Sequence, residues 1–308
     1  MVDDGGAKIV ARMAAALKSA SVSATPTQGL IVGRFGTIEF DVLWLLEHGK
    51  DIPADYADIL ERNAGVFPKT PESIRRWGEE MKKAVQATGC MATGWYTPIL
   101  VREKELLKRW FSCVSESSVQ QTPDYMPLRS IEPYYSGSIR RWTTQCQGQR
   151  VCVVSSFVET MKKQIAKGEA VIWPHAGLTL WPPTITWSWV KTGYSPALVE
   201  PDEPCSWPEE VKTWEDAVDY MVAEVVKTES RIVIIGCGGL GMILAGRLKA
   251  LGKICIVMGG AVQVLFGIKG KRWENHDFIS AHWNSEWVYP SPSETPKKAV
   301  EVERGCYW

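Results

Sequence analysis

A strand, a glycine-rich turn and a helix follow one another in residues 231–260, and this unit constrains the fold more than any other part of the chain. A short β-branched run, Arg231-Ile-Val-Ile-Ile235, leads directly into the turn Gly236-Cys-Gly-Gly-Leu-Gly241. The glycines at 236, 238 and 241 match the G-x-G-x-x-G spacing of a dinucleotide-binding turn, in which backbone N–H groups and a helix N-terminus meet phosphate. Such a unit belongs to a parallel sheet covered by helices.

The second strand of this unit, Ile254–Met258, lacks the residue that marks an NAD site. An Asp or Glu at its end would bond the ribose of NAD, whereas two glycines follow it here. The turn therefore suits a nucleotide, and transfer from a nucleotide sugar is as well supported as hydride transfer. Glycines at two strand ends let the backbone approach a ligand. We expect nucleotide contacts from Gly236, Gly238, Gly239, Gly241, Gly259 and Gly260; close helix–strand packing is the alternative explanation.

The composition is that of an ordinary globular protein. The chain has 308 residues, of which 45% are apolar and 23% are charged. Lys+Arg and Asp+Glu both number 35, so no overall field favours nucleic acid. No apolar run approaches the ~20 residues of a transmembrane helix, and the acidic start lacks a signal-peptide core. We therefore expect a cytoplasmic protein whose eight cysteines are reduced core thiols.

Strands alternate with helices along the chain, which predicts an α/β fold: a Rossmann-like parallel sheet with helices on both faces. We expect a single domain over 1–308, which can divide into lobes 1–147 and 148–308. The junctions 30–37, 150–157 and 231–241 should face one crevice, because parallel strands end at the same edge of a sheet. Three further stretches are expected to be irregular or loop: 124–137, 170–208 and the tail 273–308. A helix is expected to begin at Pro208.

The segment Gly33-Arg-Phe-Gly-Thr-Ile-Glu39 joins a buried-type strand to a helix whose expected N-cap is Thr37. Arg34 can bind a diphosphate bidentately. Glu39 can act as a base, bond a sugar hydroxyl or hold a metal. Its alternative role is to complement the helix N-terminus, which contributes ~0.3–1 kcal/mol.

Other candidates lie at further strand ends. Ser155 and Ser156 follow the strand at 148–154, and His175 follows the strand-like run Ala170–Ile172. His175 could take a proton from an acceptor or bond a phosphate, although a lone histidine is more often structural. Arg272 is a candidate phosphate clamp, whereas the neighbouring lysines read as a solvated loop.

Tryptophan is unusually frequent, with fifteen in the chain. Its flat apolar face and single donor suit the C–H faces of sugars, and we expect an acceptor surface built by Trp173, Trp181, Trp187 and Trp189. The alternatives are that these side chains fill the core or form an interface.

Three blocks in order resemble the GT-D-fold glycosyltransferases of bacteria and large algal viruses. They are the Arg-Phe-Gly-Thr-Ile-Glu segment, residues 151–164 and residues 259–273. In that family a strand ends in Arg-[Ile/Phe]-Gly-Asp-Gly-Glu, and the Asp-x-Glu pair serves the nucleotide-sugar site. Here Thr37 replaces the Asp. A single carboxylate is a poor Mg²⁺ or Mn²⁺ site, so we expect that no divalent metal is required.

The resemblance implies a glycosyltransferase that uses a nucleoside diphosphate sugar, such as UDP-xylose, UDP-galactose or UDP-glucose, and a carbohydrate acceptor, without an organic cofactor. It places the donor against Gly33, Arg34, Phe35, Gly36 and Thr37, with Glu39 as a catalytic candidate. Two other classes stay open. One is an NAD(P)- or S-adenosylmethionine-dependent Rossmann enzyme, and the other is a non-catalytic carbohydrate-binding protein.

Overall fold

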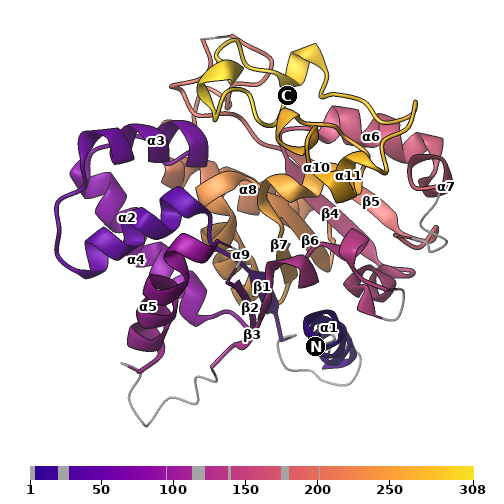
Figure 1. The fold of residues 1–308 in the computed structure, drawn as a ribbon, viewed down its shortest axis with the longest axis horizontal. Coiled ribbons are helices and arrows are strands. Elements are labelled where there is room, and N and C mark those ends of the chain that lie inside the picture. Colours follow the sequence, from indigo (N-terminus) through magenta and orange to yellow (C-terminus); the bar gives the residue numbers. More distant parts are fainter. Residues whose placement is uncertain are drawn as a thin grey trace.

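The computed structural model describes residues 4–19, 28–94, 96–112, 122–137, 140–174, 180–200 and 202–308. Its centre is a seven-stranded sheet with the order β3-β2-β1-β7-β6-β4-β5, in which every strand pair is parallel (Figure 1). The strands are β1 (Leu30–Gly33), β2 (Cys90–Thr93), β3 (Asp124–Pro127), β4 (Arg150–Ser155), β5 (Thr186–Lys191), β6 (Ile232–Gly236) and β7 (Ile254–Val257). The predicted α/β class with a parallel sheet is confirmed.

Both faces of the sheet are buried, because alternate residues of a strand point to opposite faces. In β1, Ile31 joins one apolar cluster, while Leu30 and Val32 join the other. The first face is covered by α2 (Thr37–Glu47), α3 (Ala54–Ala64), α4 (Pro71–Gln86), α5 (Leu100–Ser112), α8 (Trp214–Lys227) and α9 (Gly241–Ala250). The second is covered by α1 (Gly5–Ser19), α6 (Val158–Lys167), α7 (Glu169–Ile172), α10 (Val262–Leu265) and α11 (Asp277–Ser280).

The chain leaves neighbouring strands toward opposite faces at two places along the carboxyl edge of the sheet. After β1 it enters α2 on the first face, and after the adjacent β7 it enters α10 on the second. After β4 it enters α6 on the second face, and after the adjacent β6 it enters α9 on the first. Divergence of this kind opens a crevice outside the strand ends. Two hollows are therefore expected at this edge.

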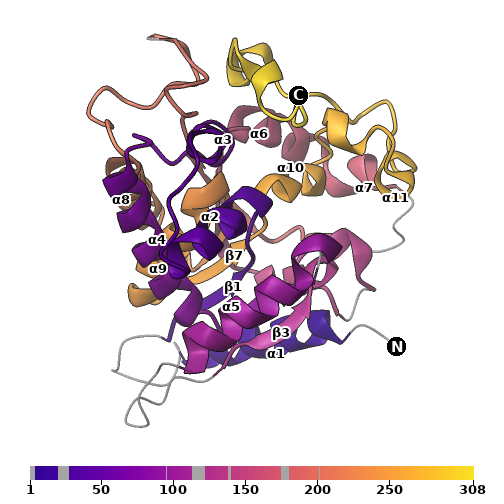
Figure 2. The same cartoon turned by 60° about the vertical axis from the view of Figure 1, so that its left-hand side comes forward.

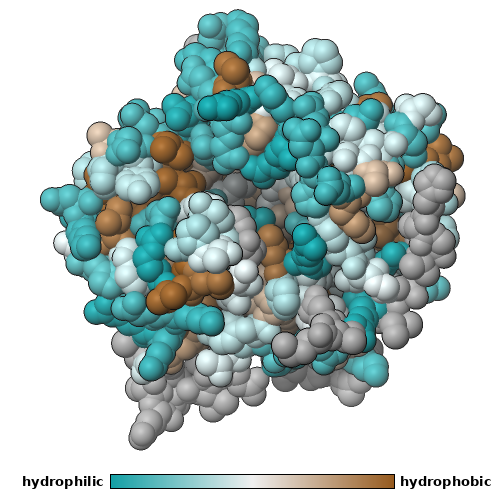
Figure 3. Space-filling model, in the orientation of Figure 1, coloured by the Kyte–Doolittle hydropathy of each residue, from teal (hydrophilic) through white to brown (hydrophobic). Residues whose placement is uncertain are grey.

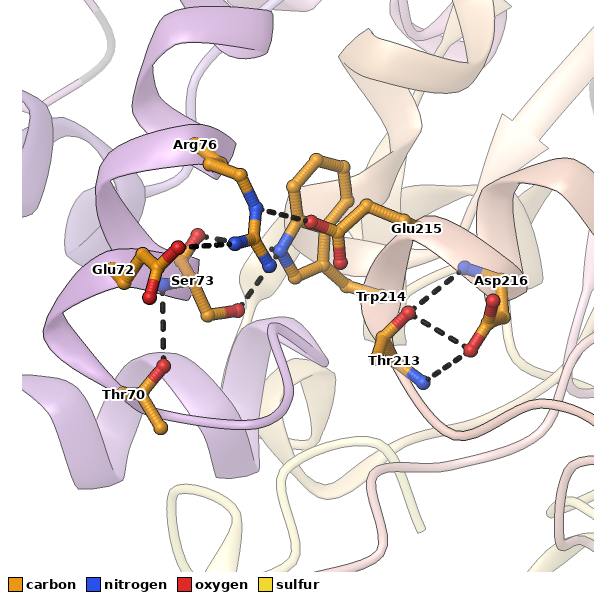
Figure 4. A network of polar contacts seen from close by, with 8 residues as sticks. All are labelled: Thr70, Glu72, Ser73, Arg76, Thr213, Trp214, Glu215 and Asp216. Carbon is orange, nitrogen blue, oxygen red and sulfur yellow. Dashed lines mark hydrogen bonds and ion pairs between the residues drawn. The ribbon is translucent and has the colours of Figure 1, made fainter.

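Helix α8 begins at a capping box, later than the Pro208 start expected from the sequence. Thr213 Oγ1 accepts from the N–H of Asp216 at 3.1 Å, and Asp216 Oδ2 accepts from the N–H of Thr213 at 2.9 Å. Figure 4 shows the neighbouring α4 reaching this helix, where Arg76 Nε lies 2.8 Å from Glu215 Oε1. The reciprocal cap satisfies the first N–H groups of the helix, which fixes the start at Trp214.

Three stretches differ from the sequence-based expectation. The region 124–137 contains β3, and 170–208 contains β5, so both edge strands were read wrongly as irregular. Ala170–Ile172, expected to be strand-like, belongs to α7. Its apolar residue Ile172 packs into the core from one turn of helix, and a short apolar run does not distinguish the two structures.

The C-terminal segment after α10 crosses the carboxyl end of the sheet. It lies at the same end of the molecule as α3 and α6, opposite α1 (Figure 2). Short 3₁₀ turns replace the loop expected there, and Val302 and Cys306 are buried against Leu198. Among the described residues, no helix combines the length and the apolar character that crossing a bilayer needs.

Candidate functional site

The larger hollow lies where the chain diverges after β1 and β7. It has a volume of about 1050 Å³. Figure 3 shows the surface of the molecule in the orientation of Figure 1, where apolar patches lie among hydrophilic residues. Strand ends, the first turn of α2 and the C-terminal segment line it together. A cleft of this size accommodates a ligand larger than a single sugar. We call it the arginine cleft, because its lining includes Arg34, Arg129 and Arg272.

Arg34 and Glu39, two of the candidate site residues from the sequence, both line the arginine cleft. Arg34 Nε donates to the carbonyl of Phe35 at 3.0 Å, and its guanidinium extends toward the end of β7. A methyl group on Gly259 would lie 3.7 Å from Arg34 Nη1. The two glycine-bearing strand ends therefore leave room for this side chain and for a ligand beside it.

The carboxylate of Glu39 turns back over the start of its own helix. The N-cap of α2 is Gly36 rather than the expected Thr37, and a methyl group on Gly36 would lie 2.0 Å from Glu39 Oε2. Glycine at the cap is what permits this approach. Burial raises the pKa of Glu39, while a hydrogen bond from its own N–H and the charge of Arg34 oppose the rise.

A divalent metal, which the family resemblance implies, does not fit these residues. Thr37 stands where an Asp would complete the pair, and the Glu39 carboxylate is engaged at the helix start. Across the described ranges no group of three His, Cys, Asp or Glu side chains is placed to hold a metal ion. Positive charge in the cleft comes from its arginines.

The glycine turn packs closely against α3. A methyl group on Gly238 would lie 2.8 Å from the carbonyl oxygen of Ala64, and one on Gly239 would lie 3.0 Å from Ala64 Cβ. Trp77 Nε1 donates to the carbonyl of Gly239 at 3.0 Å. Of this turn, Gly238 lines the arginine cleft, so only part of the turn is open to a ligand.

The end of β7 meets the C-terminal segment. Gly259, with φ of 62°, and Gly260 both line the cleft, and a methyl group on Gly260 would lie 2.2 Å from the ring of Tyr307. Any larger residue at Gly260 would push this ring away. Arg272 places its guanidinium 4.5 Å from the Tyr307 ring centroid and pairs with Glu303 at 2.6 Å. The tail thus forms one wall of the cleft.

A second acidic residue, Glu132, lines the cleft and was not predicted. Burial raises its pKa to about 7, although the charges of Arg34 and Arg129 oppose the rise. Arg129 lies 4.7 Å from the ring centroid of Tyr135. The sequence signal was Glu132-Pro-Tyr-Tyr135, a polar residue before a rigid turn, but no spacing rule relates it to Arg34.

Tyr135 and His276 add a hydrogen-bonding pair to the cleft. His276 Nδ1 accepts from the N–H of Ile279, so its Nε2 carries the proton in the neutral ring and donates to Tyr135 Oη at 3.2 Å. The Tyr135 hydroxyl proton is then available to a ligand oxygen. Sequence reasoning found no partner for His276, because the two residues are far apart in the chain.

The remaining predicted donor-binding residues divide between the cleft, a smaller hollow and the core. Gly36 and Thr37 line the cleft, and Ser156 and Gly236 line the smaller hollow. Five others lie outside both hollows and pack within the fold: Gly33, Phe35, Ser155, Gly239 and Gly241. For these five residues, close packing explains the sequence pattern, and ligand contact stays a prediction.

The four tryptophans expected at an acceptor surface are placed in or against the core. Trp173 and Trp181 are 3% and 5% exposed, and Trp187 and Trp189 pack half-buried against Phe266. None of the four lines the arginine cleft. Burial of large aromatic area therefore accounts for Trp173 and Trp181, and the acceptor role of the four tryptophans stays a prediction. His175 lies outside the described residues.

The seven described cysteines are free thiols, of which six are buried and Cys237 is partly buried. Burial raises the pKa of Cys152 and of Cys237 to about 12, so both stay protonated near neutral pH.

Comparisons of the chain with known protein families, with curated proteins and with solved structures found no match.

Proposed function

We propose that the protein is a glycosyltransferase that moves a sugar from a uridine diphosphate donor to a hydroxyl group of a carbohydrate. The observation that carries the proposal is the arginine cleft at the carboxyl edge of the sheet. Three guanidinium groups from separate segments face it, together with the carboxyl groups of Glu39 and Glu132. Cations for a diphosphate and acids for proton transfer are the groups that sugar transfer needs.

The arginines stabilise the charge that develops on the leaving diphosphate. Arg34 lies beside the glycine end of β7, where its guanidinium is placed to pair with a phosphate. Arg272 faces the same space from the other wall. Removing one preorganised donor of this kind costs about 2.7–4 kcal/mol of transition-state stabilisation.

Glu132 is the acid–base group in this proposal. The acceptor oxygen attacks the anomeric carbon, the bond from that carbon to the phosphate oxygen breaks, and the acceptor proton passes to the Glu132 carboxylate. A pKa of about 7 suits a base that works near neutral pH. Glu39, whose carboxylate is turned onto its helix, holds the α2 start in place beside Arg34.

The glycine turn supports a nicotinamide or S-adenosylmethionine cofactor less well than a nucleotide sugar. The end of α3 fills the space next to Gly238 and Gly239, where a dinucleotide would place its pyrophosphate. Burial of the tryptophans also removes the observation that suggested a purely carbohydrate-binding protein. Both classes remain outcomes of the test.

The first test measures thermal stability and turnover with UDP, UDP-glucose, UDP-galactose, UDP-xylose, NAD and S-adenosylmethionine, each with EDTA or Mn²⁺. We expect UDP species to stabilise the protein in EDTA, by about 2.7 kcal/mol at 100 times Kd. Arg34→Ala should lower kcat/KM by about 10²–10³-fold, since it removes a transition-state donor. The matched control is Arg75→Ala, an exposed arginine on α4 that does not line the cleft.

Two results would reject the proposal. One is stabilisation by NAD or S-adenosylmethionine alone. The other is release of UDP at the wild-type rate by both Arg34→Ala and Glu132→Gln. Binding of glycans without affinity for any nucleotide would instead favour the carbohydrate-binding protein.

A further inference from the structure

A second, smaller hollow lies where the chain diverges after β4 and β6. Its volume is about 110 Å³, and its walls come from the end of α3, the ends of three strands, Trp207 and the C-terminal residue Trp308. We call it the ring pocket. It shares Asn63, Gly238, Gly260 and Tyr307 with the arginine cleft, so one ligand can occupy both.

The size of the ring pocket limits what it can hold. A cavity of about 150 Å³ accommodates one benzene ring. The pocket is somewhat smaller and opens toward the arginine cleft, so its enclosed part suits a single six-membered ring better than a fused purine. Aromatic side chains, Trp207 among them, supply flat apolar surface for stacking against such a ring.

The polar groups of the pocket complement a uracil. Asn63 Oδ1 is buried and accepts no hydrogen bond within the described part of the chain, so it is ready for an N–H donor such as N3–H. Arg62 Nε is likewise buried and unpaired among the described residues, and it can donate to a ring carbonyl. Unsatisfied buried groups of both kinds are costly unless a ligand pairs with them.

The passage between the two hollows is made of glycine. Gly238 and Gly260 form shared walls without side chains, and the ring of Tyr307 stands over Gly260. A ribose that joins the two hollows would pass beside Gly238 and Gly260, next to the carbonyl group of Ala64 and the ring of Tyr307. Arg34 lines the arginine cleft next to Gly259, the neighbour of Gly260, and is the candidate partner for a diphosphate attached to that ribose.

We propose that the ring pocket binds the pyrimidine base of the donor and that Asn63, with Trp207, selects uridine over purine nucleotides. This inference rests on the proposed function, because it assigns the base of the same donor. Asn63 lies at the end of α3 and Trp207 in the loop after β5, and the fold brings these two side chains together.

Calorimetric titration of the full chain with UDP, CDP, ADP, GDP and inorganic pyrophosphate tests the inference. We expect UDP to bind at least tenfold more tightly than ADP or GDP. Asn63→Ala should weaken UDP about tenfold and leave pyrophosphate binding unchanged, whereas Arg34→Ala should weaken all five ligands. Gln147→Ala removes an exposed amide elsewhere and should change none of them.

A second variant keeps the test decisive if Asn63→Ala fails to fold. Trp207→Ala widens the pocket and should narrow the difference in affinity between UDP and GDP. Equal affinity of the wild type for UDP, ADP and GDP, together with unchanged binding in both pocket variants, would overturn the ring pocket and leave the transferase proposal standing. If neither pyrophosphate nor any nucleoside diphosphate bound, both proposals would fall.

Discussion

Glu132 shows how a single residue can be costly to the fold and useful to a site. Burial raises its pKa to about 7, and the rise survives the opposing charges of Arg34 and Arg129. Near neutral pH the carboxyl group is therefore divided between its protonated and ionised forms. Such a group can take a proton and return it. The cost to the fold is that the ionised carboxylate is poorly solvated, which lowers the free energy of unfolding.

The variant Glu132→Gln tests the raised pKa of Glu132 through the pH dependence of the free energy of unfolding. The folded protein holds the proton more tightly than the unfolded chain, so the stabilising contribution is complete below about pH 4.5 and is lost as pH rises through about 7. At pH 8 the glutamine variant should be more stable than the wild type by roughly 1–3 kcal/mol, and at pH 4 the two should be similar. Urea unfolding at both pH values measures the difference.

An equal difference between the two proteins at pH 4 and pH 8 would contradict the raised pKa of Glu132. The control is Glu301→Gln, an exposed glutamate whose removal should leave the pH dependence of stability unchanged.

At the scale of elements, the C-terminal segment supplies the cap of a helix far from it in sequence. The N-cap residue of α6 is Phe157, whose side chain carries no acceptor. Glu294 instead accepts from the N–H of Glu159 at 2.7 Å and from the N–H and Oγ1 of Thr160 at 3.1 Å and 2.5 Å. This carboxylate is fully buried, and it ties the tail to the start of α6.

Replacing Glu294 by Ala should leave these donors unsatisfied and lower the free energy of unfolding by about 2–3 kcal/mol. Glu294→Gln keeps one acceptor oxygen and should lose less. Urea denaturation followed by circular dichroism measures both changes, and Glu301→Ala on the same tail should stay within about 0.5 kcal/mol of the wild type. If Glu294→Ala lost no more stability than the Glu301→Ala control, the cap would add little to the free energy of unfolding.

For the whole molecule, the central seam of the sheet joins the two halves that the sequence suggested as lobes. β1 pairs with β7 through Leu30, Ile31 and Val32, and all three side chains are buried. The arginine cleft opens at the carboxyl end of this seam, and both halves contribute to its lining. A ligand in the cleft therefore contacts both halves at once.

The fragment 1–147 should fail to fold alone. It would expose the edge of β1 that β7 covers and would lose α9, which packs against α4 and β1. Near-ultraviolet circular dichroism should show no fixed tertiary structure, and urea should cause no cooperative transition. A sigmoidal unfolding curve for the fragment would show that the first half is an independent domain.

The sequence alone indicated the fold class and part of the site. Runs of β-branched residues predicted strands that correspond to β1, β4, β6 and β7, because such residues favour strands buried on both faces. The strands β2, β3 and β5 lack such runs of β-branched residues. These strands form by hydrogen bonding to strands already in the sheet: β2 to β1, β3 to β2 and β5 to β4.

The same division holds for the site. Arg34 and Glu39 could be placed at the carboxyl edge of the sheet from the sequence, because they follow the end of a strand within one local motif, and both line the cleft. Glu132, Asn63 and Tyr307 could not, because they belong to segments with no motif of their own. Local residue order determines where strands end and helices begin. Packing of distant segments determines which side chains face the same cleft, and that information exists only in the folded chain.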